Sequence, residues 1–324
     1  MVCGCINIQG NERAERTREQ LKHLISAKQL QKTEIMEFID RAKHMASILK
    51  QGGTHTLDGK LMAALFFEPS TRTRLSFETA MLRLGGQVIS TESAREFSSA
   101  VKGETLEDTI RVVAGYVDVI VLRHHEIGAA ARAASVSTVP ILSAGDGAGE
   151  HPTQALLDLY TIERELGHVD GLTVALVGDL LYGRTVHSLV YLLSQFTSVR
   201  LLCTAPASTP LPDDVRDFAL AKGVSVEYEP NLERAARQAD VIYQTRIQKE
   251  RFSSLAEYDA VKGKYVIDEG TLLVMKEHAI IMHPLPRAGE ITPGVDKDPR
   301  AAYFRQSHYG VPMRMGILQH CLER

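Results

Sequence analysis

The sequence predicts an α/β protein with two doubly wound parallel-sheet domains that are joined by a helix. Short apolar runs alternate with segments of helical periodicity along most of the 324 residues, which is typical of parallel sheets covered by helices on both faces. A glycine-rich break at residues 145–149 divides this alternation into two series. The chain is also long for a single core and suits about two domains of ordinary size.

The first series begins with an amphipathic helix at residues 33–50, whose apolar residues recur at helical spacing. Apolar runs then predict strands at residues 61–67, 88–89, 119–122 and 139–142. Segments of helical periodicity predict helices at residues 71–84, 104–116 and 128–135. Residues 90–103 are polar and weakly periodic, so we expect a long surface loop, and loops of this length are often functional.

The second series follows a helix that opens at His151-Pro152 and stops at Gly167, and we place the domain junction on this helix. The predicted strands are at residues 172–177, 199–202, 224–228, 241–243, 265–267 and 280–282, with helices between most of them. A final helix is expected within residues 300–324.

The composition disfavours several classes of protein. A hydrophobic content of 44% and a charged content of 24% are typical of soluble globular chains, and no apolar run is long enough to span a bilayer. A net charge of −3 argues against nucleic acid as the main partner. The polar first 20 residues lack the apolar segment of a signal peptide. We therefore expect a cytoplasmic protein, with the plastid stroma after processing as the alternative.

The most informative segment is Ser70-Thr71-Arg72-Thr73-Arg74, which lies between a predicted strand and a predicted helix. Ser70 is expected at the N-cap, where free backbone N–H groups and the positive end of the helix dipole favour an anion. Arg72 and Arg74 add planar, bidentate donors. The segment therefore predicts a phosphate site, although a capped helix with two solvated arginines is the alternative for this motif alone.

Other polar residues follow the carboxyl ends of predicted strands, where ligands bind in open α/β sheets. Arg123 follows the strand at 119–122, and a surface ion pair is its alternative role. His151 and Gln154 lie about one turn apart at a helix start, so both can contact one ligand.

The second domain adds two arginines and a proline-rich turn. Arg184 lies at a helix start after the strand at 172–177, in a segment without G-x-G-x-x-G, which disfavours NAD binding. Arg246 and Gln248 follow the strand at 241–243. The turn at 283–286 contains two prolines, and its carbonyl groups are expected to accept hydrogen bonds from a ligand.

Five cations at element ends or in the long loop suit a reaction that joins two anions, a phosphate and a dicarboxylate. They are Arg72, Lys102, Arg123, Arg184 and Arg246. No Ser-His-Asp spacing, metal-ligand cluster or pair of carboxylates stands out in the sequence. We expect catalysis by positioning and electrostatics, with no covalent intermediate, no metal and no cofactor.

Taken together, these motifs resemble the aspartate carbamoyltransferase family, over a region from about His23 to the final helix. The segment 94–99 resembles the plant and related bacterial branch. The motifs that carry the resemblance are Phe67-Glu68-Pro69-Ser70-Thr71-Arg72-Thr73-Arg74, Lys102-Gly103-Glu104-Thr105, Arg123-His124, His151-Pro152-Thr153-Gln154, Gly183-Arg184-Thr185-Val186-His187, Thr245-Arg246-Ile247-Gln248-Lys249-Glu250-Arg251 and His283-Pro284-Leu285-Pro286-Arg287.

The resemblance implies transfer of the carbamoyl group of carbamoyl phosphate to the amine of L-aspartate. The products are N-carbamoyl-L-aspartate and phosphate, in an early step of de novo pyrimidine biosynthesis. It implies a carbamoyl-phosphate-binding domain of residues 1–151 plus 303–324, on which the C-terminal helix packs back, and an aspartate-binding domain of residues 152–302. It also implies a homotrimer with active sites shared between subunits, and it leaves a regulatory subunit undecided.

The resemblance further implies a role for each candidate residue. The residues that hold the phosphate are Ser70, Thr71, Arg72 and Thr73. The residues that point at the carbonyl oxygen of carbamoyl phosphate are Thr73, Arg123 and His151. Those that orient the carbamoyl amide are Gln154 and, through their carbonyl groups, Leu285 and Pro286. Those that bind the carboxylates of aspartate are Arg184, Arg246 and Gln248. Those that reach into the neighbouring subunit's site are Ser98 and Lys102.

Two residues depart from the common family pattern, and other functions stay open. Leu181 replaces a frequent lysine, and His125 replaces a frequent proline. Ornithine carbamoyltransferase is the nearest alternative enzyme, but its members carry H-C-L-P where this chain has H-P-L-P at 283–286. An inactive ligand-binding paralogue is a second alternative, although Lys102, His151 and Arg246 are all present.

Overall fold

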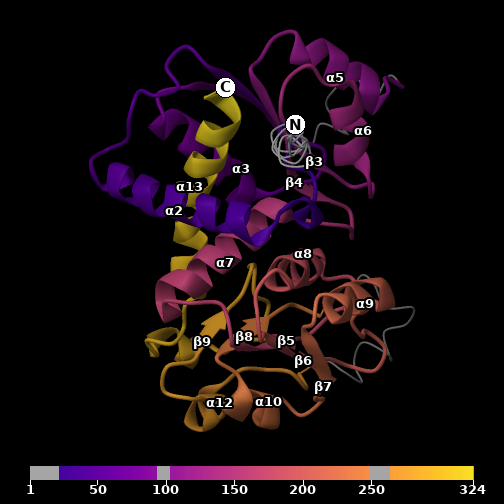
Figure 1. Ribbon diagram of the computed structural model, residues 1–324, viewed down its shortest axis with the longest axis vertical. Helices are drawn as coiled ribbons and strands as arrows, with labels where there is room; N and C mark the ends of the chain where they lie inside the picture. The colour runs from indigo at the N-terminus through magenta and orange to yellow at the C-terminus, as the bar shows by residue number, and fades with distance from the viewer. Residues whose placement is uncertain (1–21, 93–102, 248–262, 324) are drawn as a thin grey trace, which may run out of the picture.

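The computed structural model describes residues 22–92, 103–247 and 263–323. Two α/β units are stacked along the long axis of the molecule, with the first series of elements in one half and the second in the other (Figure 1). Helix α7 (Pro152–Leu166) lies between the two halves, and helix α13 (Tyr303–Leu322) runs from the second unit along the first. This arrangement confirms the predicted fold class.

The first unit contains a four-stranded parallel sheet with the order β2-β1-β3-β4. Its strands are β1 (Leu61–Phe66), β2 (Gln87–Glu92), β3 (Val119–His124) and β4 (Ile141–Asp146). Within the described residues, the first unit also contains a short 3-10 helix, η1, and four α-helices. They are η1 (Ala27–Gln29), α2 (Lys32–Lys50), α3 (Thr71–Arg83), α5 (Leu106–Ala114) and α6 (Ala129–Val136).

Successive side chains of β1 enter different cores, because they point to opposite faces of the sheet. Met62, Ala64 and Phe66 pack in the core that contains α2, α3 and α13. Ala63 and Leu65 pack against α5 and α6. Burial on both faces explains why this strand is a continuous apolar run in the sequence.

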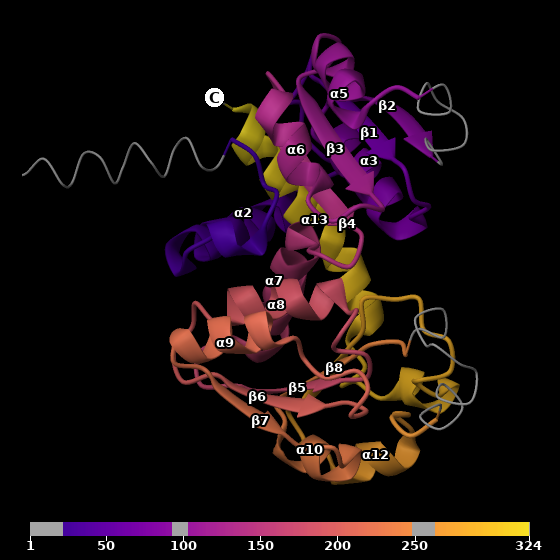
Figure 2. The same ribbon diagram turned by 90° about the vertical axis from the view of Figure 1, so that its right-hand side faces the viewer.

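The second unit contains a five-stranded parallel sheet with the order β7-β6-β5-β8-β9. Its strands are β5 (Thr173–Val177), β6 (Arg200–Thr204), β7 (Ser225–Tyr228), β8 (Val241–Gln244) and β9 (Ile280–Met282). Helices α8 (Arg184–Leu193) and α9 (Asp213–Ala221) cover one face, and α10 (Leu232–Gln238) and α12 (Glu269–Val274) cover the other (Figure 2). A 3-10 helix, η4 (Pro293–Lys297), precedes the last connection to α13.

Two long helices tie the halves together. Every residue of α7 from Pro152 to Ile162 is buried. Helix α13 contacts α2, α3 and α7, so the end of the chain returns to the first unit. No helix among the described residues is long and apolar enough to cross a membrane.

Three predicted strands differ from the structure. The strand predicted at 139–142 is β4, which begins and ends later, at Ile141–Asp146. The run at 265–267 is not a strand, because Ile267 makes only an isolated bridge to Ile291 and the carbonyl of Tyr265 accepts a hydrogen bond from the side chain of Gln244. Strand β2 extends beyond the predicted 88–89, because its pairing with β1 continues through polar residues to Glu92. Of the predicted loop at 90–103, residues 93–102 lie outside the described part.

Candidate active site

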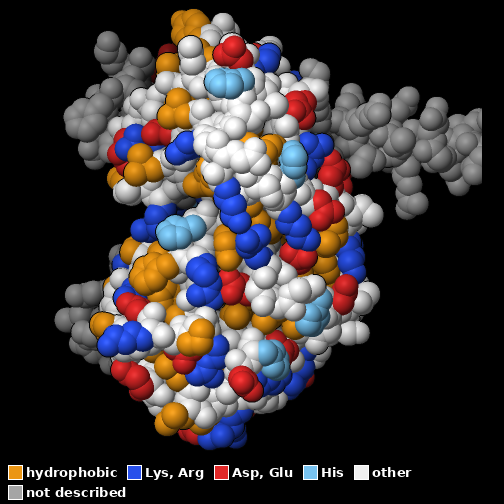
Figure 3. Space-filling model, turned by 90° about the vertical axis from the view of Figure 1, so that its left-hand side faces the viewer, with side chains coloured by type: hydrophobic (Ala, Val, Ile, Leu, Met, Phe, Trp, Pro, Cys, Tyr) orange, Lys and Arg blue, Asp and Glu red, His pale blue; other side chains and the backbone are white. Residues whose placement is uncertain are grey.

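A cavity of about 900 Å³ opens between the two units, at the carboxyl ends of their strands. In the space-filling view the molecule narrows between its halves, and Lys and Arg side chains are frequent along this narrowing (Figure 3). The predicted site residues that line the cavity are Ser70, Thr71, Arg72, Thr73, Arg123, His151, Gln154, Arg184, Arg246, Leu285 and Pro286. The structure therefore brings together residues that are up to about 200 positions apart in the sequence, as parallel sheets allow.

Three predicted site residues have no described position. Ser98, Lys102 and Gln248 lie outside the described residues, so their roles stay predictions.

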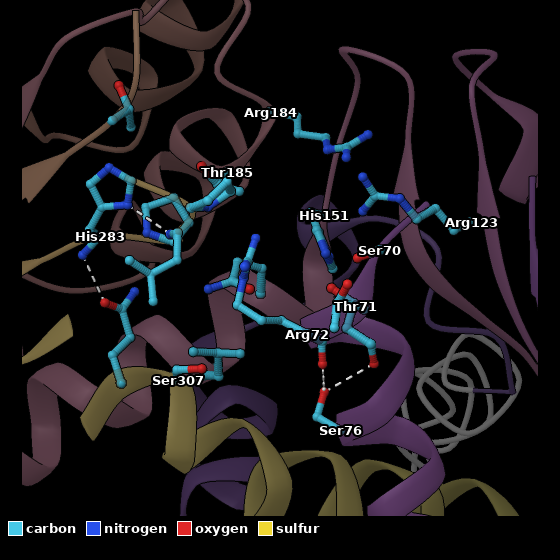
Figure 4. A pocket seen from close by; sticks show the side chains of 18 of the residues that line it. Ser70, Thr71, Arg72, Ser76, Arg123, His151, Arg184, Thr185, His283 and Ser307 are labelled. Carbon is cyan, nitrogen blue, oxygen red and sulfur yellow. Dashed lines mark hydrogen bonds between the residues drawn. The ribbon is translucent and has the colours of Figure 1, made fainter. Parts of the chain in front are cut away.

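The start of α3 forms one wall of the cavity. Ser70 occupies the N-cap, as predicted, but its side chain makes no capping hydrogen bond. Ser76, one turn further along α3, donates its hydroxyl to the carbonyl groups of Arg72 at 2.5 Å and Thr73 at 3.0 Å (Figure 4). The hydroxyl and N–H groups of the first turn are therefore placed beside the cavity, which suits an anion.

Arg74 does not join this wall, contrary to the sequence-based expectation. Its guanidinium pairs with Glu78 at 3.2 Å and with Glu92 at 3.0 Å. Since both partners are carboxylates of the same unit, Arg74 fixes α3 against the end of β2. Arg72, two residues earlier, faces the cavity.

Arg123 and Arg184 approach each other from the two units (Figure 4). A single carboxylate oxygen of Glu68 lies 3.5 Å from Arg123 and 3.6 Å from Arg184. Arg123 also donates to the carbonyl of Ala144 at 3.2 Å, and Arg184 donates to that of Gly147 at 2.6 Å. Burial, together with the charge of Arg184, lowers the pKa of Arg123 to about 9, so this guanidinium remains charged at neutral pH.

Gly145 makes the close approach of Arg184 possible. This residue follows the centre of β4 with a φ of 111°, a conformation that favours glycine. A Cβ atom at this position would lie 3.1 Å from the guanidinium carbon of Arg184. The tight packing therefore depends on the missing side chain.

His151 and Gln154 are held at the start of α7. His151 is 3% exposed, and its backbone N–H donates to Ser188 at 2.8 Å. Burial and the nearby charges of Arg184, Arg123 and Arg314 lower the pKa of His151 well below its ordinary value. A neutral imidazole keeps one N–H donor and adds no further cation to the cavity.

The proline-rich turn after β9 is braced by side chains. His283 receives a hydrogen bond from the backbone N–H of Leu285 at 2.7 Å on Nδ1, and its Nε2 lies 2.7 Å from Glu290. Its own backbone N–H donates to Gln306 at 2.8 Å. The peptide bond between Leu285 and Pro286 is cis. These contacts hold Leu285 and Pro286 at the cavity wall.

Helix α13 contributes side chains to the cavity that the sequence does not predict. Gln306, Ser307 and Arg314 line the cavity. Gln306 is 1% exposed and Arg314 is 3% exposed. Their spacing of eight residues on an otherwise apolar helix face was the available signal, because it places both side chains on one side.

Among the described residues, His124, His125 and Glu126 form a group that could hold a metal ion. This group does not line the cavity. The Nδ1 atom of His124 accepts a hydrogen bond from the backbone N–H of Glu126 at 3.1 Å. The group therefore lies apart from the cavity.

Family models match almost all of the described chain. The carbamoyl-P binding domain of aspartate/ornithine carbamoyltransferases matches residues 22–164. The Asp/Orn binding domain of the same enzymes matches residues 170–321. A chloroplastic aspartate carbamoyltransferase of Arabidopsis thaliana is 54% identical over 302 residues, which cover 93% of this chain and 77% of the relative.

Solved structures agree with these matches. The catalytic subunit of M. jannaschii aspartate transcarbamoylase superposes with a TM-score of 0.87 at 52% identity, covering 93% of this chain and 98% of that one. The Trypanosoma cruzi aspartate transcarbamoylase in complex with carbamoyl phosphate and aspartate superposes with a TM-score of 0.87 at 45% identity, covering 93% and 95%.

The environment of His151 predicts its protonation state. Because burial and three cations lower the pKa of His151 well below its ordinary value, the ring should stay neutral as the pH falls through about 6.5, where an ordinary histidine becomes charged. Nitrogen chemical shifts of labelled histidine measure this directly, and the His151→Gln variant assigns the signal. A His151 signal that titrates near pH 6.5 would show that the imidazole is not shielded by burial and the three arginines.

Proposed function

The chain belongs to the aspartate/ornithine carbamoyltransferase family, and we propose that it transfers the carbamoyl group of carbamoyl phosphate to the amine of L-aspartate. The products are N-carbamoyl-L-aspartate and phosphate, an early step of pyrimidine biosynthesis. One observation carries this proposal: Arg72, Arg123, Arg184 and Arg246 line a single cavity between two units. Such a cavity suits two anionic substrates, because each buried negative charge needs a partner.

Carbamoyl phosphate is assigned to the first domain, residues 1–151 plus 303–324. Its phosphate is held by Ser70, Thr71, Arg72 and Thr73 at the start of α3, where N–H groups and the helix dipole favour a dianion. Arg72 supplies charge-assisted hydrogen bonds. The helix holds these donors rigidly, so little reorganisation is needed when charge develops on the leaving phosphate.

Thr73, Arg123 and His151 donate hydrogen bonds to the carbonyl oxygen of the carbamoyl group. When the aspartate amine attacks, a C–N bond forms, and the carbonyl oxygen gains negative charge. Arg123, held by Ala144 and Glu68, and the neutral His151 are donors aimed at this charge. The bond between the carbamoyl carbon and the phosphate oxygen then breaks, and phosphate leaves with the bonding pair and takes up the proton that the amine loses.

The acceptor substrate is assigned to the second domain, residues 152–302. Arg184 and Arg246 bind the two carboxylates of aspartate, with Gln248 as a further donor. The cations on this side of the cavity favour aspartate over the cationic side chain of ornithine. A steady-state assay with carbamoyl phosphate tests this directly. Transfer to aspartate with little or none to ornithine is expected, and the reverse preference would overturn the assignment.

We also propose a homotrimer in which Ser98 and Lys102 of each subunit complete the site of its neighbour. The resemblance of the segment around Lys102 to the family motif supports this assembly. The protein is proposed to act in the cytoplasm, and the chloroplastic Arabidopsis relative supports the plastid stroma as the alternative.

Replacement of Arg72 by alanine should nearly abolish activity. The change removes a charge-assisted contact to the phosphate, and the loss in kcat/KM should correspond to roughly 3 kcal/mol or more, which is at least about 100-fold. The matched control is Arg234→Ala, which removes a 67% exposed arginine of α10. Near wild-type kcat/KM in a folded Arg72→Ala protein would contradict the assignment of the phosphate to the start of α3.

Replacement of Arg246 by alanine should act selectively on aspartate. Since the two anions are bound from different domains, KM for aspartate should rise about 10- to 100-fold, the loss expected for a hydrogen bond to a charged group, while the affinity for carbamoyl phosphate changes little. Arg246→Lys should recover only part of the loss, because an ammonium cannot bind a carboxylate bidentately. An equal loss of affinity for aspartate and for carbamoyl phosphate would contradict the assignment of the two substrates to different domains.

The shared site predicts complementation between two inactive variants. Lys102→Ala and Arg72→Ala proteins should each be inactive as pure trimers. After subunit exchange, every mixed trimer joins one intact loop to one intact α3 start, so about one third of its sites should be active. A folded and exchanged mixture without activity would show that Lys102 does not act across a subunit boundary.

A further inference from the structure

Asp158 is a carboxylate without any exposure, placed at the centre of the molecule. It lies on α7, one turn after Gln154, where this helix meets α13 and the end of β8. Burying a carboxylate costs several kcal/mol unless its oxygens are fully partnered. The arrangement of its partners therefore indicates what the residue does.

Three side chains donate hydrogen bonds to Asp158. The amide nitrogen of Gln154 lies 2.9 Å from Oδ1, and that of Gln306 lies 2.6 Å from the same oxygen. The hydroxyl of Tyr243 lies 2.7 Å from Oδ2. Burial raises the pKa of Asp158 to about 7, and the charge of the buried Arg314 acts in the opposite direction.

The contact with Gln154 decides which end of its side-chain amide faces the cavity. An amide carries donors on nitrogen and acceptors on oxygen, and its orientation follows the hydrogen bonds it makes. Because the nitrogen is turned toward Asp158, the carbonyl oxygen at the other end of the amide is the acceptor that Gln154 can offer to a ligand in the cavity that it lines. That end can accept an N–H group.

The contact with Gln306 reaches the second wall of the cavity. The amide nitrogen of Gln306 is bound to Asp158, and its carbonyl oxygen accepts the backbone N–H of His283 at 2.8 Å. His283 begins the turn that carries Leu285 and Pro286. The same carboxylate thus orients Gln154 in α7 and, through Gln306, anchors the proline-rich turn of the other domain.

We propose that Asp158 is a positioning residue that makes the site selective for a transferred group with an N–H donor. The inference rests on the proposed function, in which Gln154 and the carbonyl groups of Leu285 and Pro286 accept the NH₂ group of carbamoyl phosphate. A site of fixed acceptors rejects an analogue without the donor, because its buried oxygens are then left unpaired. Acetyl phosphate, which carries CH₃ in place of NH₂, is such an analogue.

The test compares Asp158→Leu with Asp158→Asn. Leucine is similar in size and offers no acceptor, whereas asparagine keeps one oxygen for the two glutamine amides. Asp158→Leu should lower kcat on the order of 100-fold, as expected when a reacting group is misplaced by about 1 Å, with a smaller change in KM for aspartate. It should also reduce the preference for binding carbamoyl phosphate over acetyl phosphate, measured by calorimetry. Asp158→Asn should restore most of both properties.

Two further variants separate positioning from loss of stability. Asp240 is another buried carboxylate, bound to the backbone of Thr173 and to Lys276 away from the cavity, so Asp240→Asn should leave the ligand preference unchanged. Gln306→Met keeps the shape of the side chain but cuts the link from Asp158 to His283. It should lower kcat about 10-fold, and it tests the inference if Asp158→Leu fails to fold.

Different results would overturn the role of Asp158 and the proposed transfer to aspartate. Wild-type kcat and wild-type ligand preference in folded Asp158→Leu, or in Gln306→Met if the former does not fold, would overturn the positioning role. A wild-type protein that transfers nothing to aspartate would overturn the proposed function. The role of Asp158 in ligand selectivity would be overturned as well if the wild-type protein bound acetyl phosphate and carbamoyl phosphate with equal affinity.

Discussion

The central constraint on this structure is the crowding of arginines at the boundary between two sheets. Arg123 and Arg184 come from different units and share one carboxylate oxygen of Glu68. Burial and mutual repulsion lower the pKa of Arg123, and burial together with the same cations lowers the pKa of His151. Such a cavity is costly without a bound anion, because like charges in a region of reduced dielectric repel strongly. Two anionic substrates would supply the missing negative charge.

Backbone carbonyl groups help to hold these cations in place. Arg123 donates to the carbonyl group of Ala144 in β4, and Arg184 donates to that of Gly147, directly after β4. A carbonyl oxygen satisfies a guanidinium N–H without removing its charge, so the cavity remains cationic. Helices α7 and α13 complete the frame, and Asp158 joins both of them to β8 through buried hydrogen bonds. The two domains therefore meet in a polar network as well as an apolar core.

Much of the fold could be predicted from the sequence because its signals are local. Strand β1 is a continuous apolar run since both of its faces are buried, and helix α7 is marked by Pro152 at its start and Gly167 at its end. The run at 265–267 misled the prediction, because burial and strand propensity do not specify a partner strand. Arg74 misled it in a similar way. It shares a motif with Arg72, yet only the packing of α3 against β2 shows that Glu78 and Glu92 bind it.

By itself, the sequence determined the two parallel sheets, the place of the polar residues at strand ends and the resemblance to carbamoyltransferases, because periodicity and short motifs are properties of neighbouring residues. Only the tertiary structure decided which of those residues share one cavity, that Gln306 and Arg314 of the last helix join them, and that Asp158 orients two amides at once. These relations depend on distances between residues far apart in the chain. Such distances arise only when the sheets and helices pack, since the direction of a side chain and its hydrogen-bond partners are fixed by that packing.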